Sequence, residues 1–165
     1  MSLRAQNYSD TLSVYFRQGK STFDRAYEGN GQRADAFVAN LRSIIDNRTQ
    51  SSVTGIRFII SCSPEGSREI NNRLVKARTS SVLSWVRRQL PLDGIPTEVT
   101  LEIEPWGELL QLVEADPAVP MREEVIPMLG RAADGYGPKA MLMELGGGEP
   151  WRYMLEHQFK ELRRF

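Results

Sequence analysis

The sequence is poor in the residues that most often build disulfides and metal centres. Its 165 residues contain one cysteine, Cys62, and one histidine, His157. A single cysteine excludes an internal disulfide and a cysteine-rich zinc site, because both need several thiols. A Ser/His/Asp triad or a histidine-based metal site would depend on the one imidazole of His157. We therefore expect no metal and no cofactor in this chain.

Net charge and long hydrophobic runs are also missing. The 21 lysines and arginines balance 21 aspartates and glutamates, so the formal net charge at pH 7 is +0. A chain without a basic surplus has no overall field that would attract nucleic acid. No run approaches the roughly 18–20 apolar residues of a membrane-spanning helix, and the first residues lack the pattern of a signal peptide. We therefore expect no nucleic-acid partner and no transmembrane segment in this chain.

The overall composition is that of a globular protein. Hydrophobic residues make up 41% and charged residues 25% of the chain, a balance typical of folded domains rather than disordered segments. The length suits one compact domain. We interpret residues 1–11 as a linker or a remnant of expression. Residues 12–165 are interpreted as a single domain, with a core over 12–104 and a helical tail over 105–165.

Hydrophobic periodicity predicts the elements of the core. Residues 12–17 and 97–104 alternate apolar with polar side chains, as a half-buried strand does, and residues 53–61 are rich in the β-branched residues of a central strand. Residues 32–47 and 67–90 carry apolar side chains at the spacing of an amphipathic helix. The order strand–helix–strand–helix–strand predicts an α/β (α+β) sandwich, in which both helices cover one face of a small mixed sheet.

The tail has a different character, because prolines recur between its short apolar segments. Residues 109–114 and 123–131 are predicted as short helices, and residues 151–164 as an amphipathic helix. These segments together predict a C-terminal helical extension of the α/β core.

One arginine interrupts the apolar stripe of the second predicted helix. Arg78 lies between Leu74 and Trp85 at helical spacing. An arginine there must reach solvent or find a partner, because an unpaired buried charge is costly. The partner is either a carboxylate or a carbonyl-rich loop of this chain, or the carboxylate of a ligand held bidentately. The loop and helix N-terminus that precede Arg78 offer backbone N–H groups to the same anion.

The residues around Arg78 follow a recognisable pattern. The loop Cys62-Ser63-Pro64-Glu65-Gly66 precedes the helix, and Asn71, Leu74 and Arg78 follow at fixed spacing. This pattern resembles the OmpA/MotB-type C-terminal domain, which also occurs in the peptidoglycan-associated lipoprotein. Residues 16–23 resemble the first strand-to-helix turn of that family. The S-P-E-G loop and the helical tail are similar to OmpA-like proteins of Bacteroidetes.

The resemblance implies a non-catalytic domain on the periplasmic face of the outer membrane, in the cell envelope of a Gram-negative bacterium. In this family a loop Asp and a helix Arg bind the charged ends of diaminopimelate in the peptide stem of peptidoglycan, and an Asn supports the loop. The resemblance assigns the arginine role to Arg78 and the asparagine role to Asn71. Other envelope proteins are further expected partners.

Three positions depart from the family pattern. Ser63 stands where the family has the loop Asp, Cys62 where it has Thr, and Arg17 where it has an acid after the phenylalanine of its first strand. A serine offers an ammonium group only a hydroxyl, and Arg17 would repel that group. Glu65 either replaces the missing carboxylate or simply caps the helix or faces solvent. The expected ligand-binding residues are therefore Arg78, Asn71, Ser63, Cys62, Arg17 and Glu65.

An alternative function stays open at this point. If the pocket is degenerate, the domain is a protein–protein interaction module in the assembly of outer-membrane or surface structures, with tail aromatics such as Trp106 and Trp151 at interfaces. A ligand carboxylate at Arg78 or an internal Arg78–Glu65 pair would distinguish the two functions. Enzymatic activity is not expected, because no nucleophile–base pair with an orienting group can be assembled from these residues.

The last residues carry one more expectation. In the resembled family a pair of arginines leads into a final strand that completes the sheet, and this sequence closes with Arg163-Arg164-Phe165. We expect that strand to be truncated or to follow Phe165. We also expect the tail or a partner chain to cover one edge of the sheet, because an open edge promotes strand pairing.

Overall fold

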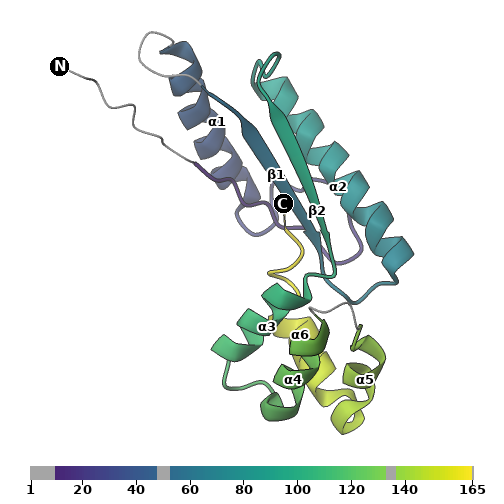
Figure 1. Cartoon of the computed structure of the whole chain (residues 1–165). Helices are drawn as coiled ribbons and strands as arrows, with labels where there is room; N and C mark the ends of the chain where they lie inside the picture. Colours follow the sequence, from purple (N-terminus) through teal and green to yellow (C-terminus); the bar gives the residue numbers. More distant parts are fainter. Residues whose placement is uncertain (1–9, 48–52, 133–136, 165) are drawn as a thin grey trace, which may run out of the picture.

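A computed structural model describes residues 10–47, 53–132 and 137–164, so most of the expected linker, residues 1–9, lies outside the described residues. The chain has an α/β part and, beneath it, a lobe of short helices (Figure 1). The elements in chain order are α1 (Asn30–Asp46), β1 (Ile56–Cys62), α2 (Arg68–Gln89), β2 (Thr97–Ile103), α3 (Trp106–Ala115), α4 (Arg122–Ala132), α5 (Lys139–Glu144), the 3-10 turn η1 (Leu145–Gly148) and α6 (Glu149–His157).

Strands β1 and β2 form a parallel pair. Their register runs from Ile56 opposite Thr97 to Cys62 opposite Ile103. The alternation predicted from the sequence is present in β1, where Phe58 and Ile60 are buried and contact α2. These strands confirm the expected segments at 53–61 and 97–104, with ends shifted by a few residues. The expectation that 97–104 is half-buried is wrong, because Val99 and Leu101 are exposed and no residue of β2 is buried.

Both long helices lie on the same side of the strands (Figure 1). Val38 and Leu41 of α1 share a buried cluster with Val82 and Val86 of α2, and the cluster also holds Val14 and Phe16. The apolar stripes of the two helices therefore meet over one face of the sheet, as the sequence predicts.

The ends of α2 follow from local chemistry. The Ser67 hydroxyl caps the helix by accepting a hydrogen bond from the Ile70 N–H at 3.3 Å, which satisfies one of the free donors of the first turn. The helix ends at Gln89, just before Pro91, because a proline disfavours helical backbone in the residue that precedes it. Ser67 therefore marks the boundary between the preceding loop and α2.

The prediction of a regular strand at 12–17 is wrong. The segment has a single antiparallel bridge, between Tyr15 and Arg164, supported by the Phe16 N–H donating to the Arg163 carbonyl at 2.8 Å. A strand forms a ladder only where a neighbouring strand continues beside it. Among the described residues, the 12–17 segment has such a neighbour only at Arg163 and Arg164. The regular sheet therefore has two parallel strands, and its mixed character is limited to this bridge.

The last described residues run between the 14–16 segment and β1. The Ser61 N–H donates to the Arg164 carbonyl at 2.9 Å, and the Ser61 hydroxyl donates to the Leu162 carbonyl at 2.7 Å. The tail thus covers the edge of β1 at Ser61, as expected. Residues 138–146 do not supply a strand there, because they form α5 and the start of η1.

The helical lobe has a hydrophobic core of its own. Its buried residues come from α3, α4, α5, α6 and the segments beside them, and include Leu109, Leu129, Leu142 and Met154. The short helices predicted at 109–114 and 123–131 are confirmed as α3 and α4. Within the described residues, no helix combines the length and the apolar character needed to cross a membrane.

The amphipathic helix predicted at 151–164 is too long, since α6 ends at His157. Beyond this point the chain turns, and Phe159 and Leu162 are buried in the core of the lobe. These two residues keep the apolar pattern of a helix although the backbone has left it. After this turn, residues 162–164 lie beside β1.

Asp116, which follows α3, ties that helix to α6. Its carboxylate accepts hydrogen bonds from the Ala118 N–H at 3.0 Å, the Tyr153 hydroxyl at 3.1 Å and the Gln158 amide at 2.6 Å. These hydrogen bonds, the one from the Ala118 backbone most of all, hold the pKa of the Asp116 carboxyl below its ordinary value of 3.8.

We expect this carboxylate to make the lobe acid-sensitive. Because the folded pKa is lowered, the stabilisation is complete above pH 3.8 and is lost as the pH falls through the folded pKa. The Asp116→Asn variant should therefore melt at a lower temperature than the parent at neutral pH, and the gap should close as the pH falls to about 2. Circular dichroism melts across this range measure the gap. A gap that stays constant at every pH would contradict the prediction.

Candidate functional site

Arg78 of α2 is buried, with 1% of its surface exposed. Its Nε donates to the Lys20 carbonyl at 3.0 Å, and its Nη1 faces the Ser61 carbonyl at 3.3 Å and the Cys62 Sγ at 3.2 Å. The guanidinium also lies over the Phe16 ring, 4.8 Å from the ring centroid. Among the described residues its hydrogen-bond partners are thus two carbonyls and a thiol, and Arg78 does not pair with Glu65.

Burial dominates the electrostatics around this guanidinium. It lowers the pKa of Arg78 below its ordinary value, and the nearby charge of Arg163 lowers it further, while Cys62 and Glu65 act in the opposite direction. Burial likewise raises the pKa of the Cys62 thiol, so the sulfur stays neutral near pH 7 and brings no negative charge to Arg78. Two buried cations therefore share this region.

The loop between β1 and α2 is built onto Asn71. The Asn71 side chain is buried, and its amide donates to the Gly66 carbonyl at 3.3 Å. A Cβ at position 66 would come within 2.5 Å of the Asn71 Oδ1, so any other residue there would displace the Asn71 side chain. Asn71 thus supports the loop, and Ser63 is buried inside it.

Glu65 pairs with Arg163 from the end of the chain. The Arg163 Nη1 lies 2.9 Å from the Glu65 Oε1, with only 9% and 17% of the two side chains exposed. The pair leaves two buried polar atoms without a hydrogen-bond partner, the Glu65 Oε2 and the Arg163 Nε. Unpartnered buried atoms of this kind are uncommon and call for an explanation.

A lysine from the helical lobe closes the other side of the loop. The Lys139 Nζ, at the start of α5, donates to the Glu65 carbonyl at 2.9 Å and to the Gly66 carbonyl at 2.6 Å. Sequence reasoning missed Lys139 and Arg163 as site residues. In the sequence, the adjacent arginines at 163 and 164 are the only signal that points to Arg163. No local pattern distinguishes Lys139 from other surface lysines.

Arg17 is the predicted site residue that the structure places apart. Its Nε lies 3.1 Å from the Asp24 Oδ2, and its guanidinium lies over the Tyr27 ring at 4.4 Å. More than half of the side chain is exposed. In the described parts of the chain, no contact joins the Arg17 side chain to Arg78, Asn71, Ser63, Cys62 or Glu65. Among the described residues, Arg17 therefore does not contact the other expected binding residues, from which it was expected to repel the ammonium group of a ligand.

The site thus gathers three cations around one carboxylate. Arg78, Arg163 and Lys139 surround the Cys62–Gly66 loop, and Glu65 is the one acid in direct contact with any of them among the described residues. Two of these cations, Arg78 and Arg163, are buried, and a local surplus of positive charge is suited to an anionic ligand group. No family model, no curated protein and no solved structure matches this chain.

Proposed function

We propose that this chain is a non-catalytic OmpA-like domain that associates with peptidoglycan through the peptide stem, on the periplasmic face of the outer membrane. One observation carries the proposal: Arg78 is fully buried beside the Cys62–Gly66 loop and has no carboxylate partner among the described residues. A ligand carboxylate would supply the missing negative charge.

The unpartnered atoms beside the loop support a zwitterionic ligand. Diaminopimelate presents a carboxylate and an ammonium group from one carbon atom. The carboxylate suits Arg78, and the ammonium suits the Glu65 Oε2, which is buried without a hydrogen-bond partner. Arg163 holds the other oxygen of Glu65 and so fixes the direction of the free one. In this proposal Glu65 takes the role that the family gives to a loop Asp at the position of Ser63.

The arrangement of segments also supports the proposal. The 14–16 segment, residues 162–164, β1 and β2 lie side by side in that order, because Tyr15 bridges Arg164, Ser61 bonds Arg164, and β1 pairs with β2. With both helices on one face, this is the arrangement that an OmpA-like domain with an inserted helical lobe would have.

Binding to purified sacculi tests the proposal. We expect the wild-type chain to cosediment with peptidoglycan that contains diaminopimelate, and to bind at least about tenfold less to peptidoglycan with lysine at that position, which lacks the second carboxylate. The Arg78→Lys variant should lose binding about tenfold or more, because lysine keeps the charge but not the bidentate geometry.

Arg73→Lys is the matched control, since Arg73 is an exposed arginine on the same helix. Thermal melting shows whether each variant is folded. Equal binding to both kinds of peptidoglycan, or undiminished binding by a folded Arg78→Lys variant, would overturn the proposal and favour the interaction-module alternative.

A further inference from the structure

The outer edge of β2 is open among the described residues. The Ile56 N–H donates to the Pro96 carbonyl, and the Glu104 N–H donates to the Cys62 carbonyl. In a parallel pair, alternate residues face the partner strand, so the even-numbered residues of β2 face β1. The N–H and C=O groups of Val99 and Leu101 therefore face away from β1. In the described ranges no hydrogen bond is made by these outward groups.

The same two residues expose apolar side chains. Val99 is 44% and Leu101 is 39% exposed, although their register partners on β1, Phe58 and Ile60, are buried. Natural edge strands usually carry a proline, a lysine or a bulge that blocks further pairing. The segment Thr97–Ile103 contains no proline and no lysine, and its ladder to β1 is continuous. This edge is thus open to another strand.

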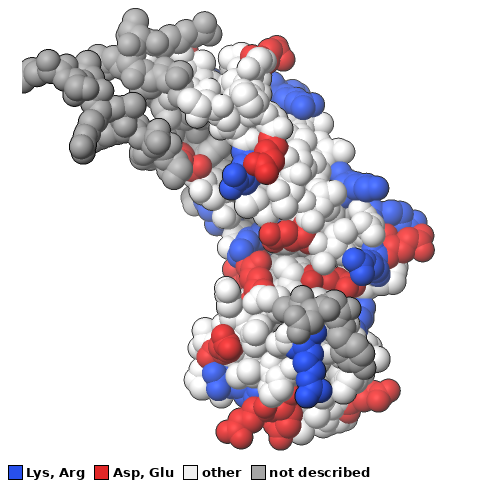
Figure 2. Space-filling model, in the orientation of Figure 1, with Lys and Arg blue, Asp and Glu red and all other residues white. Residues whose placement is uncertain are grey.

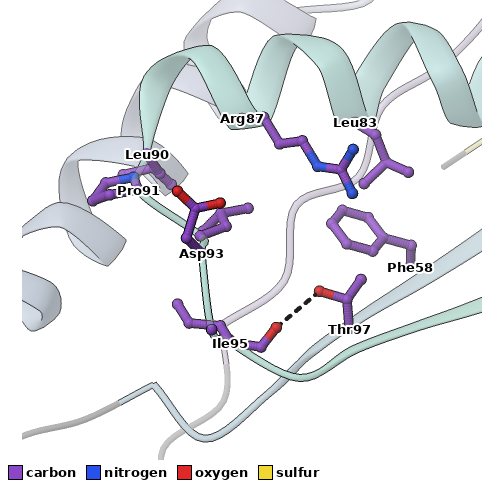
Figure 3. Close-up of a pocket in the computed structure, with 10 residues that line it drawn as sticks. Phe58, Leu83, Arg87, Leu90, Pro91, Asp93, Ile95 and Thr97 are labelled. Atoms are coloured by element: carbon purple, nitrogen blue, oxygen red, sulfur yellow. Dashed lines mark hydrogen bonds between the residues drawn. The ribbon is translucent and has the colours of Figure 1, made fainter.

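A pocket of about 390 Å³ lies at the beginning of β2, on the face that α2 covers. Phe58, Leu83, Leu90 and Ile95 are among its lining residues, Arg87 and Asp93 bring one charge each, and polar atoms make up most of the exposed lining surface. Figure 3 shows the Arg87 guanidinium pointing across the pocket toward Phe58, while Asp93 lies beside Leu90 and Pro91. Among the described residues Arg87 has no hydrogen-bond or ion-pair partner.

The opposite face of β2 carries two glutamates. Glu98 and Glu102 alternate with Val99 and Leu101, so they point to the face of the sheet that carries no helix. Glu98 pairs with Arg57 at 2.9 Å with both side chains more than 60% exposed. Figure 2 shows acidic and basic side chains interspersed on the face of the molecule that it presents. A strand added to this edge would have apolar side chains on one face and basic side chains on the other.

We propose that the edge of β2 binds the extended C-terminal segment of a partner protein, one that alternates apolar and basic residues and ends in an apolar residue. The segment adds to β2 as an antiparallel strand, which brings its last residue to the start of β2. The last side chain enters the pocket, its carboxylate binds Arg87, and basic residues face Glu98 and Glu102. Strand addition of this kind gains affinity from backbone hydrogen bonds and specificity from a pocket.

A fluorescent eight-residue peptide that alternates lysine and valine and ends in a free valine carboxylate tests the proposal by anisotropy. We expect saturable binding to the wild-type chain. Amidation of the peptide C-terminus should weaken binding about tenfold, the effect of one charge-assisted contact. Arg87→Gln should weaken binding of the free-acid peptide equally and should leave the amidated peptide unchanged, because both changes remove the same contact.

Arg88→Gln is the matched control, because Arg88 is the adjacent exposed arginine and does not line the pocket. N-methylation of the peptide on alternate residues supplies a second readout, since only one of the two methylated sets should abolish binding. Equal binding by both sets, or no effect of amidation and Arg87→Gln, would overturn the proposal. Sedimentation showing a dimer that Val99→Lys dissociates would also overturn it, because a second copy would then occupy the edge.

Discussion

Replacing Glu65 with leucine should lower the free energy of unfolding by about 3–5 kcal/mol, the usual cost of removing one partner from a buried ion pair. Among the described residues the Glu65 carboxylate is the one acid that contacts Arg163, whereas Lys139 bonds only the Glu65 backbone carbonyl. Without it, Arg163 is left buried as an uncompensated charge, close to the buried Arg78. Urea denaturation followed by circular dichroism measures the loss.

Two further variants define the cause of that loss. Glu98→Leu removes the acid of an exposed pair, Arg57–Glu98, and should cost no more than about 1 kcal/mol. Adding Arg163→Met to Glu65→Leu removes the unpaired charge and should recover most of the lost stability. If the double variant is less stable than Glu65→Leu alone, burial of an unpaired cation is not the reason for the effect.

The helical lobe should be about as sensitive to a cavity. Leu129 of α4 is fully buried in the core of the lobe, and Leu129→Ala should lower the free energy of unfolding by about 2–5 kcal/mol. The loss combines the missing transfer free energy of the side chain with the cost of the cavity. Leu101→Ala is the matched control, because Leu101 is 39% exposed, and it should cost less than about 1 kcal/mol.

The same variant shows whether the lobe and the α/β part unfold together. Trp106 and Trp151 belong to the lobe, while Trp85 packs beside the cluster under the sheet. Because residues 162–164 hydrogen-bond to Ser61 and to Phe16, we expect one cooperative transition in both fluorescence and circular dichroism. Two transitions, of which Leu129→Ala shifts only one, would show that the two parts are independent.

Sequence reasoning succeeded where the signal is local. The apolar spacing of residues 32–47 and 67–90 fixes one face of each helix, and α1 and α2 form there. The β-branched run and the alternating run likewise became β1 and β2. The patterns of the helices and of β1 are sufficient because an element with one buried face has few other ways to bury it. The alternation of β2 predicted the strand but not its burial, since Val99 and Leu101 are exposed.

Apolar periodicity could not predict which distant segments pair with each other. Leu12, Val14 and Phe16 alternate correctly, but a strand also needs a neighbour, and here that neighbour is the Arg163–Arg164 stretch. No periodicity tells which remote segment will pair with another. The boundary of α6 failed for a related reason, since Phe159 and Leu162 are buried by the fold of the lobe and not by a continuing helix.

The candidate site divides in the same way. Arg78 and the loop before it could be found, because an arginine in an apolar stripe is visible in the sequence. That Arg78 would rest on the Lys20 and Ser61 carbonyls could not be predicted from spacing. Lys139 and Arg163 reach the loop only through the packing of the lobe. Contacts of this kind depend on the tertiary structure alone.

The bridge between Tyr15 and Arg164 also determines when this molecule can finish folding. It joins residues near the two ends of the described chain, and contacts of such long sequence separation form slowly because the intervening chain must first be ordered. During synthesis β1 and β2 can pair early, yet Ser61 must wait for residues 162–164 to leave the ribosome. We therefore expect a nascent chain that ends within α6 to expose the 14–16 segment and the edge of β1 at Ser61, where chaperones can bind.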